Sequence, residues 1–135
     1  MGLQLIFVVE TNKKCNADWV YIKDTIDNFY EYKRTEVKLT PVYMEGKGNY
    51  NSHKKRKEID NLISQYSVTS KNNYSKVIYC FDCDEYNSKA DDRKFLETVK
   101  KYCKDYKNLV AQTYKIKTSN IMKVLDSYEE LNRKV

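Results

Sequence analysis

The sequence predicts an α/β fold: a three-layer domain in which a four-stranded, mostly parallel sheet, in the order 2-1-3-4, carries helices on both faces. Apolar runs of strand length alternate with segments whose apolar residues recur at helical spacing. The first run is near-continuously apolar and the third is continuously apolar, as is typical of parallel strands buried on both faces. With only 3 glycines and 1 proline, the chain has few residues for the turns of an all-β fold. Its 135 residues fit one domain, spanning residues 1–135.

The first half of the chain contains two predicted strands and the helix between them. Residues 3–10 form a near-continuous apolar run that ends in Glu10. Helical spacing of apolar residues then predicts a helix over residues 19–30. Residues 36–44 read as the second strand, and Pro41 inside it favours an edge position because proline cannot donate to a ladder.

The second half continues the alternation. Ser52 is a predicted N-cap for a helix over residues 52–66. Residues 77–81 form the third strand, and residues 88–106 carry a third helical pattern that begins with a capping-box-like Ser88. The last two elements are a short strand and a helix, at residues 109–114 and 121–131. Right-handed crossovers and an edge position for the strand with Pro41 give the order 2-1-3-4.

The charge balance is moderately basic, with 25 Lys+Arg against 19 Asp+Glu and a net charge of +6. Such a charge is compatible with a phosphate-rich partner, and it also occurs in Lys-rich and Tyr-rich chains of biased composition. No apolar run has the length of a membrane helix, and no secretory signal pattern is visible at the N-terminus. We therefore expect a cytoplasmic protein without a membrane partner.

Three acidic residues follow predicted strands that we expect to be neighbours. Glu10 ends the first strand, and Asp82 and Asp84 directly follow the third. Residues two apart in extended chain point the same way, so the two aspartates share a direction. Ligands of open α/β sheets bind at the carboxyl ends of the strands, at the point where the strand order reverses. Converging carboxylates predict a hard cation, Mg²⁺ or Mn²⁺ as its substitute, held by all three acids; the alternative is that these acids only solvate a loop.

These residues also carry a resemblance to a known family. The strand ending in Glu10 and the later Asp82-Cys83-Asp84 resemble the Toprim (topoisomerase–primase) domain, which has a Glu after its first strand and Asp-x-Asp after its third. The order and spacing are similar to those of small RloB-type and OLD-type Toprim proteins of phage defence and mobile elements. The resemblance implies a Toprim/Rossmann-like fold and Mg²⁺-dependent cleavage or nicking of nucleic acid. It also implies that the aspartates bind Mg²⁺ and that Glu10 acts as acid/base or as a further ligand.

Two other functions remain open from the sequence. Thr11 stands where the family usually has glycine, which favours a nucleic-acid or nucleotide-binding module that kept the fold without turnover. A phosphoryl-accepting receiver module would use Asp82, Thr113 and Lys115, but the chain lacks a fifth predicted strand and a second acid after the first. The chain has little room for a separate specificity domain, so a partner protein could provide it. The sequence does not predict an oligomeric state.

A basic segment lies at the same predicted edge of the sheet. It follows the second strand and opens the second helix, whose N-terminus itself favours anions. A phosphate backbone would offset the clustering of its cations, and the alternative is a solvated loop. The predicted nucleic-acid contacts are Lys47, Lys54, Lys55, Arg56 and Lys57, joined by Lys13 and Lys14 after the first strand.

Two further residue types have weaker patterns. His53, the only histidine, could act as a general base, but an exposed residue at a helix start is the simpler interpretation. Cys80 and Cys83 have the CxxC spacing of zinc ligands. Residues three apart on a strand point to opposite faces, so ordinary reduced thiols are the expected state.

Overall fold

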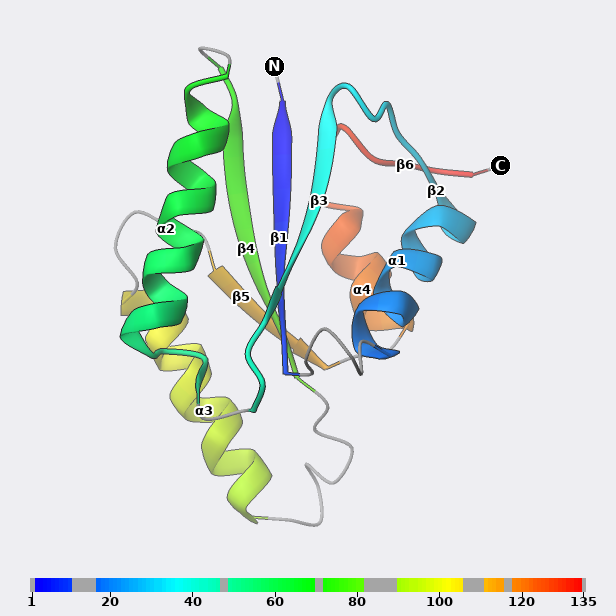
Figure 1. Cartoon of the computed structure of the whole chain (residues 1–135). Coiled ribbons are helices and arrows are strands. Elements are labelled where there is room, and N and C mark those ends of the chain that lie inside the picture. The colour runs from blue at the N-terminus through cyan, green and yellow to red at the C-terminus, as the bar shows by residue number, and fades with distance from the viewer. Residues whose placement is uncertain are drawn as a thin grey trace.

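A computed structural model of the chain describes residues 2–10, 17–46, 49–69, 72–81, 90–105, 111–115 and 118–134. It contains a parallel sheet with helices packed on it, which confirms the predicted α/β class (Figure 1). The elements are β1 (Leu3–Val9), α1 (Ala17–Phe29), β2 (Tyr30–Glu31), β3 (Val37–Tyr43), α2 (His53–Ser67), β4 (Tyr74–Phe81), α3 (Ala90–Asp105), β5 (Ala111–Lys115), α4 (Thr118–Leu125) and β6 (Asn132–Arg133).

The main sheet has the order β3-β1-β4-β5, and each neighbouring pair is parallel. This is the order predicted for the four runs, with β1 in the interior beside β4. The strand that contains Pro41 lies at the edge of the sheet, as predicted. Seven residues of β1 are buried without interruption, which explains why its sequence shows no alternation of apolar and polar residues.

Two hydrophobic cores lie on opposite faces of the sheet. Alternate residues of β1, such as Leu5 and Phe7, pack with α1 and α4 on one face. The intervening residues, Ile6 and Val8, pack with α2 and α3 on the other. Figure 1 shows α1 and α4 on one side of the strands and α2 and α3 on the opposite side. The period-two alternation of the strand thus divides its apolar side chains between the two layers of helices.

One buried side chain ties the layers together through polar contacts. Gln4, fully buried on β1, donates from Nε2 to the Leu62 carbonyl at 3.3 Å and to Ser75 Oγ at 3.1 Å. Its Oε1 accepts from Thr40 Oγ1 at 2.8 Å. The amide therefore joins three strands and α2 with its polar atoms satisfied, as a buried polar group requires.

The chain's second, two-stranded sheet was not predicted. β2 and β6 pair antiparallel, and Tyr30, predicted as helix, belongs to β2. The Tyr30 hydroxyl donates to Asp126 Oδ1 at 2.5 Å, and Arg133 Nη2 lies 2.6 Å from Asp126 Oδ2. The final helix stops at Leu125 rather than at residue 131, because the tail turns back to join β2.

None of the helices in the described residues is both long enough and apolar enough to cross a membrane.

Candidate metal and nucleic-acid site

The carboxyl edge of the sheet gathers the ends of the strands and the starts of the helices. β1 ends at Val9, level with Tyr43 on β3 and with Cys80 on β4. The helices α1, α2 and α3 all begin at this end of the strands, in the lower part of Figure 1. Helix N-termini carry partial positive charge, so this edge suits an anionic ligand.

Glu10 follows the last residue of β1 and is half-buried at this edge. Its backbone is held by the segment that leaves β3. The Gly46 N–H donates to the Glu10 carbonyl at 3.0 Å, and the Met44 N–H donates to the Val9 carbonyl at 2.9 Å. These bonds fix the main chain from which the Glu10 carboxylate projects.

The turn that makes these bonds is conformationally unusual. Glu45 has φ 59°, in the left-handed region that non-glycine residues seldom occupy, and Gly46 has φ 135°. Asn49 Nδ2 donates to the Met44 carbonyl at 2.9 Å, which helps to hold the turn. Backbone strain of this kind concentrates at functional sites, so its place beside Glu10 is consistent with a ligand site.

The other two predicted metal ligands, Asp82 and Asp84, lie outside the described residues. They follow Phe81, the last residue of β4, in the sequence. Within the described ranges, no three His, Cys, Asp or Glu side chains are grouped closely enough to hold a metal ion. The one described member of the predicted set, Glu10, is half-buried directly after an interior strand, and carboxylate oxygens are ligands that Mg²⁺ prefers.

Asp18 is an acid at this edge that the sequence analysis missed. It lies in the first turn of α1 and is half-buried, and this burial raises the pKa of its carboxyl group. Its charge also acts on Cys80 near the end of β4, where burial first and Asp18 second raise the pKa of the thiol. A partly buried carboxyl group with a raised pKa at the carboxyl edge of the sheet is a candidate for proton transfer.

Cys80 is fully buried, and within the described residues it is a free thiol. A thiol whose pKa is raised by burial resists forming the thiolate that zinc requires. Its CxxC partner Cys83 lies outside the described residues, so the structure describes only one end of the pair. The properties of Cys80 favour the expected reduced thiol.

The basic helix start is well defined. Ser52 is the N-cap of α2, as predicted: its side chain accepts from the Lys55 N–H at 3.2 Å. Lys54 and Lys57 are exposed, and so is Arg56. Lys55 differs, because its Nζ lies 3.3 Å from Glu58 Oε2 and its side chain is only 14% exposed.

The remaining predicted residues of this surface divide into two groups. His53 is exposed as the first residue of α2, which agrees with its simpler interpretation. Three predicted phosphate contacts lie outside the described residues: Lys13, Lys14 and Lys47.

Aromatic packing holds the start of α2 against α3. Tyr50, two residues before the N-cap, is buried, and its ring centroid lies 5.6 Å from that of Phe95 and 5.3 Å from that of Tyr102. Both contacts are edge-to-face, an arrangement that adds stability beyond area burial. The exposed lysines therefore project from a fixed helix start.

No family model, curated protein or solved structure matches this chain. The resemblance to Toprim domains therefore stays a prediction from Glu10, Asp82 and Asp84. Independently of that resemblance, a half-buried glutamate, a half-buried aspartate and a basic helix start share one edge of a parallel sheet.

Proposed function

We propose that this protein is a small Toprim-like enzyme that cleaves or nicks phosphodiester bonds in nucleic acid with Mg²⁺, of the kind used by bacterial defence systems and mobile elements. The observation that carries the proposal is the adjacency of β1 and β4 in the sheet. Val9 is level with Cys80, and the next residues along the two chains are Glu10 and Phe81, the last residue of β4, which directly precedes Asp82. Three acids on two such strand ends would form one oxygen-rich site.

The acidic and the basic residues of this edge have different roles. Asp82 and Asp84 bind the metal, and Glu10 is either a further ligand or the acid/base. Bound Mg²⁺ would supply a clamp on the phosphate and would stabilise charge in the transition state. Lys54, Arg56 and Lys57 hold the phosphate backbone through contacts independent of sequence.

Asp18 adds a second candidate for proton transfer. Burial raises the pKa of its carboxyl group above that of an exposed aspartate. This carboxyl group is suited to donate a proton to a leaving oxygen, and Glu10 is the proposed acid/base or further ligand.

Nicking of a supercoiled plasmid, and cleavage of labelled single-stranded DNA and RNA, in Mg²⁺ test this function. We expect wild-type activity that EDTA abolishes, and loss of that activity in Glu10→Gln. Glu97→Gln is the matched control, because Glu97 is an exposed glutamate on α3.

The outcomes separate the candidate functions. Binding without Mg²⁺-dependent cleavage by the wild type would favour the non-catalytic module that Thr11 suggests. Full cleavage by Glu10→Gln would refute the proposed site.

A further inference from the structure

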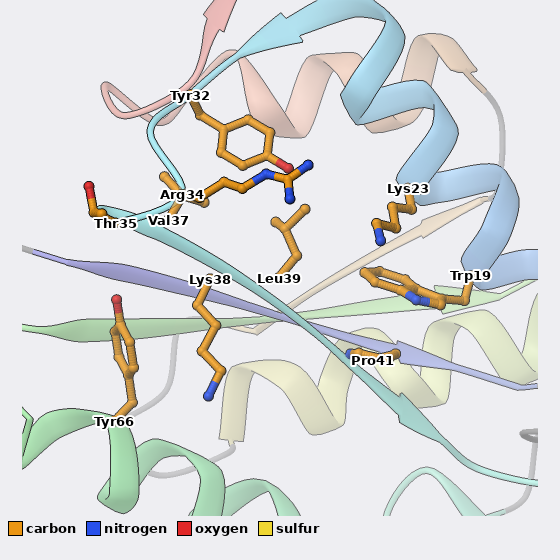
Figure 2. Close-up of a pocket in the computed structure, with 10 residues that line it drawn as sticks. All are labelled: Trp19, Lys23, Tyr32, Arg34, Thr35, Val37, Lys38, Leu39, Pro41 and Tyr66. Carbon is orange, nitrogen blue, oxygen red and sulfur yellow. The ribbon is translucent and has the colours of Figure 1, made fainter.

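A groove runs along the outer side of β3, the outermost strand of the main sheet. Its volume is about 480 Å³, and Figure 2 shows its lining side chains. Trp19 and Lys23 come from α1, Arg34 from the segment before β3, and Tyr66 from α2. Nothing in the function proposed above uses this groove.

The backbone N–H and C=O groups of every second residue of β3 point toward this groove. Glu36 O accepts from Leu3 N at 2.8 Å, and Met44 N donates to Val9 O at 2.9 Å. The backbone N–H and C=O groups of the even-numbered residues of β3 therefore point toward β1. The backbone groups of Leu39 therefore point away from the sheet. An edge strand with outward N–H and C=O groups is a template for another strand.

Pro41 occupies another outward position and has no N–H to offer. Its placement explains how proline is tolerated in β3, since no bond of the β1 ladder is lost. It also limits self-pairing of the edge, because a long added strand would meet a position without a donor. A short strand centred on Leu39 avoids most of this penalty.

Side chains from both faces of the sheet line the groove. Leu39 lies on the face covered by α1, where it packs against the first core. Lys38 points to the opposite face, the side on which Tyr66 of α2 lies, as Figure 2 shows. A hollow flanked by both helix layers continues the plane of the sheet, which is the place of an additional strand.

The groove is also electrically one-sided. Of the ten described residues that line it, Lys23, Arg34 and Lys38 are basic and none is acidic. All three are exposed. A second copy of this chain carries a net charge of +6 and would bring the same cations to the edge. Charge complementarity therefore selects an acidic occupant.

We propose that a short, extended, acidic peptide segment of a partner protein adds to β3 as a further strand. Its backbone pairs with Leu39, its carboxylates lie against Lys23, Arg34 and Lys38, and its apolar side chains face Trp19 and Leu39. This proposal stands whether or not the carboxyl edge cleaves nucleic acid, because the two sites use different residues.

The direct test is amide hydrogen exchange measured by NMR with a defined probe. The probe is a blocked seven-residue peptide, Glu-Glu-Val-Glu-Val-Glu-Glu, added to the full chain; its two valines share one face of the added strand, and its glutamates lie on both faces. We expect the exchange of the Leu39 amide to slow by about tenfold or more at saturation, because this N–H gains an acceptor. The amides of Lys38 and Thr40, which point toward β1, are expected to change little.

Two control ligands make the outcome specific. The same peptide methylated at alternate backbone nitrogens keeps the charge but loses strand pairing, so it should bind more weakly and leave Leu39 unprotected. Seven-residue oligothymidylate tests a nucleic-acid occupant. Binding of the oligonucleotide at this edge without protection of Leu39 would overturn the peptide proposal, and so would equal binding of the methylated peptide.

Charge variants complete the test. Replacing Lys23, Arg34 and Lys38 together by glutamine should weaken peptide binding by about tenfold, as expected for three exposed ion pairs. The matched control replaces three exposed lysines of α3, Lys94, Lys100 and Lys101, and should bind like the wild type. Equal weakening in both variants would show attraction to net charge alone and would overturn the site.

Discussion

Replacing Lys54 and Lys57 together by glutamine should flatten the salt dependence of nucleic-acid binding. Both side chains are exposed, and they lie three residues apart in the first turns of α2, on one face of the helix. A cation that contacts a duplex phosphate contributes about 0.9 to the slope of log K against log salt. The double variant should therefore lose about 1.8 of that slope. Between about 50 and 200 mM salt, its affinity should fall about tenfold less than that of the wild type.

Lys55→Gln is the matched control within the same helical turn. Lys55 is paired with Glu58 at 3.3 Å, so a phosphate contact would first have to break this pair. We expect its substitution to change the slope by less than about 0.5. Fluorescence anisotropy of a labelled duplex across a salt series measures all three proteins. An unchanged slope in the double variant, or an equal change in Lys55→Gln, would refute the assignment of this surface.

Two further predictions concern stability. Ser52→Ala should lower the free energy of unfolding by about 1 kcal/mol in urea titrations, because α2 loses its N-cap acceptor; no change would show that the cap is dispensable. Hydrogen bonds from Arg133 and Tyr30 lower the pKa of the Asp126 carboxyl group. The stabilisation of the fold by this carboxylate is therefore complete above the unfolded pKa of about 3.9, and it is lost as the pH falls through the lower pKa of the folded state. Asp126→Asn should therefore reduce the acid sensitivity of unfolding below about pH 4, measured by Trp19 fluorescence, and an unaltered pH profile would contradict this role.

The strand order was predictable because local signals and chain rules agreed. The continuous apolar runs of β1 and β4 required burial on both faces, and Pro41 required an edge. The pairing of β2 with β6 was not predictable. Each of these strands has two residues, and they come from distant parts of the chain. Tyr30 lies four residues after Ile26, so its spacing matched a helix although it begins a strand.

The site was predictable only where strand ends define it. Glu10 ends the predicted strand, and in the structure it directly follows β1. The sequence does not single out Asp18, because an acid in the first turn of a helix is expected simply to stabilise the helix dipole, and its burial depends on tertiary packing. Spacing alone does not show which lysine pairs with Glu58, so the sequence predicts the same phosphate contact for Lys55 as for its exposed neighbours.

Anomalous diffraction from crystals soaked in Mn²⁺ tests the central proposal, a divalent metal at the carboxyl edge, most directly. We predict one Mn²⁺ bound to the Glu10 carboxylate together with Asp82 and Asp84, at a metal–oxygen distance of about 2.1 Å. Glu10→Gln should weaken or remove this peak. A saturating soak that leaves Glu10 without a metal, or that places the ion on other residues, would contradict the proposed site.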